Sequence, residues 1–430
     1  MGSFLTFSCV VVEGTKKDKI NILSTEDVDF YIINYEGIRN NTRNEYNEDG
    51  KKIGKKKAEH DLEKFLSTDF STRHKMMLVL DESTSVKNYS TGAFKLLKKM
   101  YKNFPCRYIS SGTLVANKPE DIWAQMYIVN PDILGSAFYK DFANKYCVLG
   151  TSYSKYAIAG YKNLNQLKFV LSQNSIRRLK EDLPNLPEKV FKNYFIDMCQ
   201  KQAFLYKKLD EEVLSILTTD DTVETIKNNV IKLMQMSCNP SVIDSSLLSE
   251  TNKVKELDRI LEDRIASGGE KIVLWSYSVD NLKFLYERYK GFNPVLVYGG
   301  VKDKKERFDL VQKFQNDDTC KLFIGNPQAC SMGITLTKSA TAVFYDRDFN
   351  QLNWKQAIDR VHRIGQTKTV EIICLINRNT IDEEIESILL SKGAISEFLV
   401  TDKVRDVAVV NELCLKDIRK KLLSSHARII

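Results

Sequence analysis

The sequence predicts an α/β fold with two parallel-sheet lobes and a helical insertion between them. Short β-branched or apolar runs alternate with longer helical patterns, which is typical of parallel α/β units. Strand signals disappear from about Asp197 to Asp263, where the pattern is helical, and then return. These observations predict a first lobe at 1–190, a helical insertion at 191–250, a second lobe at 251–400 and a helical tail at 401–430.

The expected strands are short and lie in two groups. In the first lobe they are Ser8–Gly14, Val28–Tyr35, Met76–Asp81 and Arg107–Ser111. In the second lobe they are Lys271–Ser278, Pro294–Gly300, Lys321–Asn326, Thr341–Asp346 and Val370–Ile376. Their apolar and β-branched content predicts strands that are buried inside parallel sheets.

The composition narrows the class of protein. The 430 residues, 43% of them hydrophobic and 28% charged, allow two or three domains with proper cores. We expect no membrane span, because no apolar run approaches about 20 residues. We expect no signal peptide, because no basic region precedes the short apolar stretch at the N-terminus. Nine cysteines without a CxxC pair and four histidines argue against a disulfide framework or a zinc site. They suggest an intracellular compartment. The net charge of +8 is compatible with nucleic-acid binding without establishing it.

The Lys-rich segment Lys51–Lys57 superficially resembles a phosphate-binding loop. Gly50 and Gly54 followed by Lys55 are one residue short of the spacing G-x-x-x-x-G-K-[ST]. Lys56 stands where Ser or Thr would hold the metal. We therefore reject this interpretation and expect a solvated loop, since clustered like charges resist burial.

An acidic pair ends one strand of the first lobe. The apolar run Met76–Leu80 leads directly into Asp81 and Glu82. At the carboxyl edge of a parallel sheet, both carboxylates would face the crevice where such sheets bind ligands. One acid could hold Mg²⁺ through its water shell, and the other could orient or deprotonate a water that attacks a γ-phosphate. The alternative is a helix N-cap with a favourable charge in the first turn.

Two arginines near the end of the second lobe are the other candidates for chemistry. Arg360 and Arg363 are three residues apart, so on a helix they project from one face. Two guanidinium groups facing a nucleotide would neutralise the charge that spreads over its phosphate oxygens in the transition state. The alternative is a pair of solvated or salt-bridged side chains.

The order of these and other motifs resembles one family. In the first lobe the acidic pair is followed by Tyr108–Thr113, Glu120–Trp123, Asn130-Pro131, Arg177-Arg178-x-Lys180 and Leu186-Pro187-x-Lys189, and the helical insertion contains Cys238-Asn239-Pro240. In the second lobe come Trp275–Tyr277, Tyr298–Gly300, Arg307, Phe314-Gln315, Ser331–Thr337 and Gln356–Gln366. This succession resembles the Swi/Snf-type members of helicase superfamily 2, and the string Gln356–Gln366 is its most specific part.

The resemblance implies two RecA-like lobes that hydrolyse ATP with Mg²⁺ while moving on double-stranded DNA. It implies that Asp81, Glu82, Arg360 and Arg363 are catalytic, with Mg²⁺ held by Asp81 through water. The residues that it places near the nucleotide are Gly112, Thr113, Gly333 and Gln356. Those that it places on DNA are Ser276, Gly299, Thr335 and Thr337.

The resemblance is incomplete at one point. In the family a strand and a Gly-rich phosphate loop with Lys and Thr precede the segment that matches Val28–Asn40, and residues 1–27 contain no such loop. We therefore expect an incomplete first lobe with unpaired strand edges and an exposed apolar face. We also expect a separate chain to supply the loop, or the loop to have been lost. The alternatives are an ATP-dependent motor, in viral or bacterial replication, repair or recombination, and a non-catalytic DNA-binding remnant.

Overall fold

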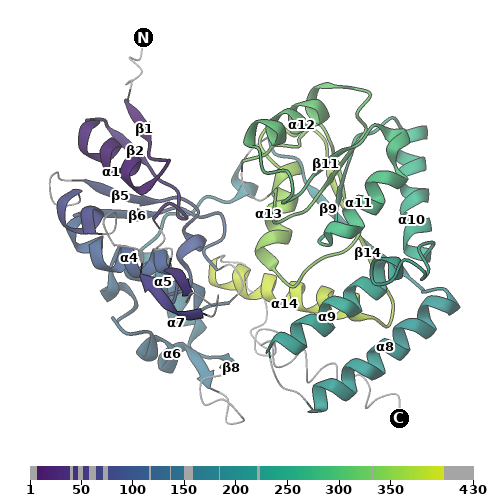
Figure 1. The fold of residues 1–430 in the computed structure, drawn as a ribbon, viewed down its shortest axis with the longest axis horizontal. Helices are drawn as coiled ribbons and strands as arrows, with labels where there is room; N and C mark the ends of the chain where they lie inside the picture. The colour runs from purple at the N-terminus through teal and green to yellow at the C-terminus, as the bar shows by residue number, and fades with distance from the viewer. Residues whose placement is uncertain are drawn as a thin grey trace. The chain divides into compact units, whose positions relative to one another are not determined.

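The computed structural model consists of two compact units, coloured from purple to blue and from teal to yellow in Figure 1. It describes residues 7–38, 42–46, 52–57, 64–70, 76–115, 118–135, 137–149, 158–183, 185–219, 223–330 and 333–400. Unit 1 comprises residues 1–175 and 395–405, and unit 2 comprises residues 176–394 and 406–430. The predicted helical tail at 401–430 lies outside the described residues. Within the described part, no helix is both long and apolar enough to cross a bilayer.

Unit 1 contains two pairs of parallel strands. Strand β1 (Cys9–Val11) pairs with β2 (Phe30–Ile32), and β5 (Met77–Leu80) pairs with β6 (Cys106–Ile109). The helices of unit 1 are α1 (Lys16–Thr25), α4 (Gly92–Met100), α5 (Asp121–Val129), α6 (Tyr139–Tyr146) and α7 (Leu164–Gln173). Helix α5 is buried over almost its whole length and forms the centre of the core of this unit.

The other strands of unit 1 form two antiparallel ribbons. Strand β3 (Thr42–Tyr46) pairs with β4 (Lys52–Lys57), and β7 (Cys147–Leu149) pairs with β8 (Ile158–Tyr161). The expectation of a loop at the Lys-rich segment is therefore wrong, because its backbone pairs with β3. Like charges disfavour burial, yet a two-stranded ribbon satisfies its backbone hydrogen bonds without burying side chains.

One face of the parallel strands in unit 1 is exposed. The exposed residues alternate along each strand with residues that are less exposed, as the period of two in a β-strand requires. The large apolar members of this set are Val11, Phe30, Ile32, Met77, Val79 and Tyr108, each between 47% and 60% exposed. An exposed apolar face is what the sequence led us to expect of this lobe.

Unit 2 is built on a six-stranded sheet in which every pairing is parallel. The strand order is β11-β12-β10-β13-β14-β9. The strands are β9 (Lys189–Ile196), β10 (Ile272–Trp275), β11 (Val295–Val297), β12 (Leu322–Gly325), β13 (Thr341–Phe344) and β14 (Val370–Asn377). The α/β class that the sequence predicts is thus confirmed. Strand β9 was missed, because its lysines and its largely exposed side chains hide the apolar signal.

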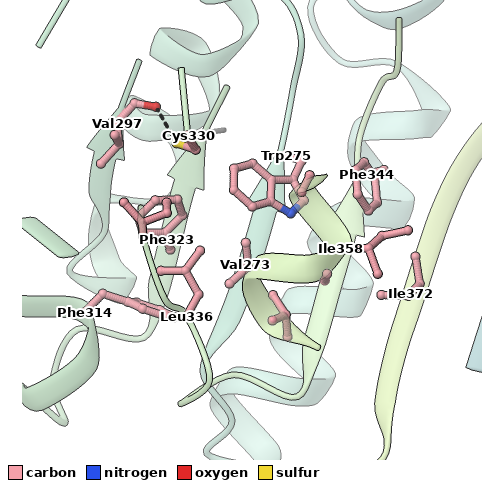
Figure 2. Close-up of a cluster of buried hydrophobic side chains, with 14 of the residues drawn as sticks. Val273, Trp275, Val297, Phe314, Phe323, Cys330, Leu336, Phe344, Ile358 and Ile372 are labelled. Atoms are coloured by element: carbon pink, nitrogen blue, oxygen red, sulfur yellow. Dashed lines mark hydrogen bonds between the residues drawn. The ribbon is translucent and has the colours of Figure 1, made fainter. Parts of the chain in front are cut away.

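Helices cover both faces of this sheet. The helices of unit 2 are α8 (Gln200–Thr219), α9 (Val223–Cys238), α10 (Asn252–Leu261), α11 (Val279–Arg288), α12 (Lys304–Asn316), α13 (Gln351–Val361) and α14 (Ile381–Val400), the last of which extends into unit 1. One apolar cluster joins the sheet residues Trp275 and Phe323 to Phe314 of α12 and Ile358 of α13 (Figure 2). A second cluster joins the strands to Leu257 of α10 and Leu282 of α11. This close packing holds α13 in place.

Short helical turns connect these elements. They are η1 (Phe65–Phe70), η2 (Ser83–Val86), η3 (Tyr101–Asn103), η4 (Pro131–Leu134), η5 (Lys180–Asp182), η6 (Pro240–Val242), η7 (Glu262–Ser267) and η8 (Lys290–Phe292). Two of them bear on the candidate site. Turn η2 directly follows the acidic pair at the end of β5, and η5 lies between α7 and β9.

Candidate functional site

The acidic pair lies at the carboxyl end of β5, as predicted. Asp81 and Glu82 are both exposed, and Glu82 has a left-handed backbone conformation with φ 46°. The backbones after β5 and β6 remain paired beyond the strands. The Ser110 N–H donates to the Leu80 carbonyl at 2.8 Å, and the Ser83 N–H donates to the Ser110 carbonyl at 3.0 Å. The pair is therefore presented to solvent from a fixed strand end.

A buried hydrogen bond holds this strand end against α5. The Ser83 hydroxyl donates to Oε1 of Gln125 at 2.6 Å, and Nε2 of Gln125 donates to the carbonyls of Leu114 and Asp121. Gln125 thus ties together the segments that follow β5 and β6. Ser83 and Gln125 cannot be recognised from the sequence as residues of the site, because nothing in their local pattern marks them.

Tyr35 contacts the acidic turn from the segment after β2. Its hydroxyl donates to the carbonyl oxygen of Asp81 at 2.7 Å. Burial, together with the negative charges of Asp81 and Glu82, raises the pKa of Tyr35 to about 12. The hydroxyl therefore keeps its proton at neutral pH and remains a donor that fixes the Asp81 backbone.

The predicted nucleotide contacts Gly112 and Thr113 lie just after β6. Gly112 is exposed, with no atom within 4 Å of the place where a Cβ would stand. Thr113 is buried, and its N–H donates to the hydroxyl of Ser111 at 3.1 Å. The structure thus brings this turn beside the acidic one through the paired strands β5 and β6.

The donor set in unit 1 fits a magnesium ion. Mg²⁺ is usually held in proteins by one or two carboxylates, with waters and substrate phosphates completing its shell. Asp81 and Glu82 supply exposed carboxylate oxygens of that kind. The described residues contain no cluster of three or more His, Cys, Asp or Glu side chains suited to a metal. The site therefore fits an ion that arrives together with a phosphate ligand.

The two arginines lie at the end of α13 in unit 2 and share one acceptor. Nη1 of Arg360 and Nη1 of Arg363 each donate to the Ile334 carbonyl at 3.4 Å. The Arg360 carbonyl in turn accepts from the Leu336 N–H at 2.9 Å. Because charge-assisted hydrogen bonds are usually about 2.7–2.9 Å long, these contacts to Ile334 are weak. Phosphate oxygens would be stronger acceptors for both groups.

The loop that contains Gly333, Thr335 and Thr337 is tied to the same turn. Gly333 has φ +74° and open space around it, which suits the close approach of a backbone or a phosphate. Nε2 of Gln366 donates to the carbonyls of Thr337 and Ser339. Ser331 and Met332 of the matching stretch lie outside the described residues. The predicted nucleotide and DNA contacts of this loop thus lie next to the arginines.

Two further predicted contact residues, Gln356 and Gly299, lie in different elements of unit 2. Gln356 is partly exposed on α13, one helical turn before Arg360, so it shares that face of the helix. Gly299 is exposed in the turn that follows β11. No contact joins Gly299 to the arginine turn among the interactions of the described residues.

Ser276 is buried and takes part in internal hydrogen bonds. Its side chain is fully buried, and its hydroxyl donates to Asp346 at 2.9 Å. Asp346 also accepts from the Tyr277 N–H and from Nδ2 of Asn281. Burial raises the pKa of Asp346, and these hydrogen bonds oppose that effect. Of this group, Tyr277, Asn281 and Asp346 line a cavity of about 340 Å³. A DNA contact at Ser276 would require its hydroxyl to leave Asp346.

Comparison with known protein families decides the affiliation of the chain. Residues 6–242 match the model of the SNF2-related domain, and residues 252–365 match the helicase conserved C-terminal domain. This chain belongs to the SNF2-related family. The resemblance inferred from the motifs is thereby confirmed. Proteins of this family are ATP-hydrolysing and helicase-like, and they use ATP, normally with Mg²⁺.

Several SNF2-related proteins are similar over most of this chain. Chromodomain-helicase-DNA-binding protein 1-like of Danio rerio is 28% identical over 375 residues, which cover 81% of this chain and 35% of that protein. SWI/SNF-related matrix-associated actin-dependent regulator of chromatin subfamily A member 1 of Homo sapiens is 25% identical, with 74% and 31% covered. An uncharacterized ATP-dependent helicase of Mycoplasma pneumoniae is 26% identical, with 79% and 32% covered. The chain spans about a third of the length of these relatives.

Two solved structures are also similar. The SWI2/SNF2 ATPase core of Sulfolobus solfataricus in complex with double-stranded DNA is 25% identical, with a TM-score of 0.43, and the match covers 95% of this chain and 82% of that one. The C-terminal part of the Fun30 ATPase domain is 18% identical, with a TM-score of 0.42, and the match covers 55% and 97%.

Proposed function

We propose that this chain provides the catalytic acids and the arginine pair of an ATP-driven motor that translocates on double-stranded DNA. The observation that carries the proposal is the arginine turn. The guanidinium groups of Arg360, in the last turn of α13, and of Arg363, just past its C-cap, both reach the Ile334 carbonyl, beside a loop whose Gly333 leaves room for a phosphate. Such an arrangement can stabilise the charge that develops on a phosphoryl group.

In this proposal the residues divide the work between the two units. Asp81 would hold Mg²⁺, which neutralises phosphate charge when bound, and Glu82 would orient and deprotonate the attacking water. Arg360 and Arg363 would stabilise the transition state from the other unit. Gln356, Gly112 and Thr113 would contact the nucleotide, whereas the loop at Thr335 and Thr337, together with Gly299, would contact the DNA backbone.

The motor also needs a Gly-rich loop with a lysine to cradle the phosphates of ATP. Residues 1–430 contain no G-x-x-x-x-G-K-[ST] sequence. We therefore include in the proposal that this loop comes from outside these residues, with a separate partner chain as one source. A DNA-binding protein without ATPase activity is the rival function, and a missing loop would suit it equally well.

The test is ATP hydrolysis by the purified chain with a Gly-rich loop segment added in trans, with and without double-stranded DNA, for the wild type, Glu82→Gln and Arg363→Ala. We expect DNA-stimulated turnover that both substitutions abolish, with a loss of about 10³-fold or more for the arginine. Glu13→Gln and Arg259→Ala, at exposed positions in the two units, serve as matched controls and should retain the activity. DNA binding without turnover, even after a Gly-rich loop segment is added in trans, would favour the rival.

A further inference from the structure

The segment between α7 and β9 contacts the turn that carries Arg360 and Arg363. Lys180 Nζ lies 2.6 Å from Oδ1 of Asp359 and donates to the His362 carbonyl at 2.8 Å. The Pro187 carbonyl lies 2.7 Å from Nε2 of His362 and accepts from it. Each of the two groups that Lys180 contacts belongs to the residue immediately before one of the arginines, Arg360 or Arg363.

The backbone of the turn is also held by the loop that leads to β13 and by a bond of its own. The Leu336 N–H of that loop donates to the Arg360 carbonyl, and within the turn the Gln366 N–H donates to the Arg363 carbonyl, both at 2.9 Å. These two amides therefore report directly on whether the turn keeps its shape. Lys180 and the loop that contains Leu336 therefore both contact the backbone of residues 360–363.

A simple surface ion pair does not account for Lys180. An exposed pair is usually worth only about 0–1 kcal/mol, and here both side chains are less than two-fifths exposed. In addition, His362 is the C-cap of α13, so the ammonium group lies at the negative end of the helix and satisfies one of its last carbonyls. The cap comes from the segment that leads out of unit 1, about 180 residues away in the sequence.

The hydrogen bonds of His362 make these contacts sensitive to a displacement of the segment that contains Lys180 and Pro187. Nε2 of His362 is engaged by the Pro187 carbonyl, and Nδ1 is buried without a hydrogen-bond partner. Any shift of the Lys180 and Pro187 backbone would remove two contacts from His362 at once. The turn that carries Arg363 would then lose its fixed geometry, although no residue of the turn itself had changed.

We propose that Lys180 is a positioning residue for the Arg360–Arg363 turn, and that Lys180 and Pro187 form a latch through which the connection between the two units controls that turn. The latch sets the backbone from which both guanidinium groups project. A displacement of the connecting segment would therefore alter the alignment of both arginines together. The importance of this for hydrolysis rests on the proposed function, but the latch itself can be tested without ATP.

The experiment is hydrogen–deuterium exchange of the purified chain, comparing the wild type with Lys180→Met, Lys180→Arg and Asp359→Asn. We expect the amides of Leu336 and Gln366 to exchange roughly tenfold faster in Lys180→Met, since local openings are governed by local contacts. Asp359→Asn should show a smaller increase, because Lys180 keeps its bond to the His362 carbonyl. Lys180→Arg should restore most of the protection. Lys283→Met, at an exposed lysine of α11, is the matched control and should change nothing at these amides.

Three results would contradict the proposal that Lys180 and Pro187 control the arginine turn. These are unchanged exchange at both amides in Lys180→Met, exchange that rises equally in β12 and α11, and failure of Lys180→Arg to restore any protection. The second result would mark Lys180 as a general stabiliser of the unit. The proposed function fails separately: if the exchange behaves as expected while Arg363→Ala leaves DNA-stimulated turnover unchanged, the latch stands and the catalytic role of the arginine falls.

Discussion

At the scale of single residues, the backbone of Glu82 is the most unusual feature of the acidic site. Its φ of 46° lies in the left-handed region, which costs a non-glycine residue about 1–2 kcal/mol. Strain of this kind persists where the surrounding structure determines the conformation, and it gathers at functional sites. Here the pairing of Ser83 and Ser110 beyond the strand ends imposes it.

We therefore expect Glu82→Gly to be more stable than Glu82→Ala by about 1 kcal/mol in the free energy of unfolding of unit 1. Both substitutions remove the carboxylate, so their difference isolates the backbone strain. Urea denaturation followed by fluorescence would measure it, with Trp123 reporting on unit 1. Equal stability of the two variants would mean that residue 82 relaxes once its side chain is removed.

At the scale of elements, a buried ion pair joins α10 to the start of α14. Lys253 is fully buried, and its Nζ lies 2.6 Å from Oδ2 of Asp382, which also accepts from the Asn377 N–H. Burial acts to lower the pKa of Lys253, but the charge of Asp382, its hydrogen bond and the nearby Cys238 and Asp346 together hold the pKa above its ordinary value. The lysine therefore stays charged, and the helices depend on the pair being complete.

Breaking this pair on one side should be costly. Lys253→Met leaves an uncompensated buried carboxylate, and we expect a loss of about 3–5 kcal/mol in the free energy of unfolding of unit 2. The double variant Lys253→Met/Asp382→Asn should recover part of this loss, since the amide oxygen can still accept from Asn377. Urea denaturation would measure the free energy of unfolding of both variants. Lys283→Met, at an exposed position of α11, should stay within about 0.5 kcal/mol of the wild type. A double variant no more stable than the single one would contradict this account.

The strands show which elements could be predicted from the sequence and which could not. The buried strands β10, β12 and β13 were found because continuous apolar runs mark strands that are covered on both faces. Strands β4 and β9 were not, because backbone pairing orders them while lysines dominate or interrupt their sequences. A hydrophobic pattern records burial, and it is silent about a strand such as β9, whose side chains remain largely exposed.

The candidate site divides in a similar way. The motif order predicts Asp81, Arg360 and Arg363 as candidates, because each belongs to a short string that resembles a motif of the family. The contacts that hold them, such as Ser83 to Gln125 and Lys180 to Asp359, join segments far apart in the chain and depend on geometry that no local pattern encodes. Ser276 shows the opposite case, in which a motif predicts a contact that the structure does not favour. Its motif position suggested a DNA contact, while its hydroxyl is hydrogen-bonded to Asp346.

At the scale of the whole molecule, the two units differ in how completely their sheets are covered. In unit 2 the apolar clusters bury both faces of β10 to β14, as parallel sheets usually require, whereas the edge strand β9 keeps most of its side chains exposed. In unit 1 the outward side chains of β1, β2, β5 and β6 stay about half exposed. An apolar surface of this kind on a single molecule promotes association once it approaches several hundred Å².

This difference predicts how the purified chain behaves at high concentration. We expect it to self-associate through unit 1, and we expect Met77→Thr/Val79→Thr to reduce the average mass measured by light scattering. Threonine suits a strand, and both side chains are about half exposed, so the stability of unit 1 should change by less than about 1 kcal/mol. The control is Phe308→Thr on α12 of unit 2, which removes a similarly exposed apolar side chain outside the parallel strands of unit 1. If the control lowers the mass as much as the double variant, association depends on total exposed apolar area, and the open strand face of unit 1 has no special part in it.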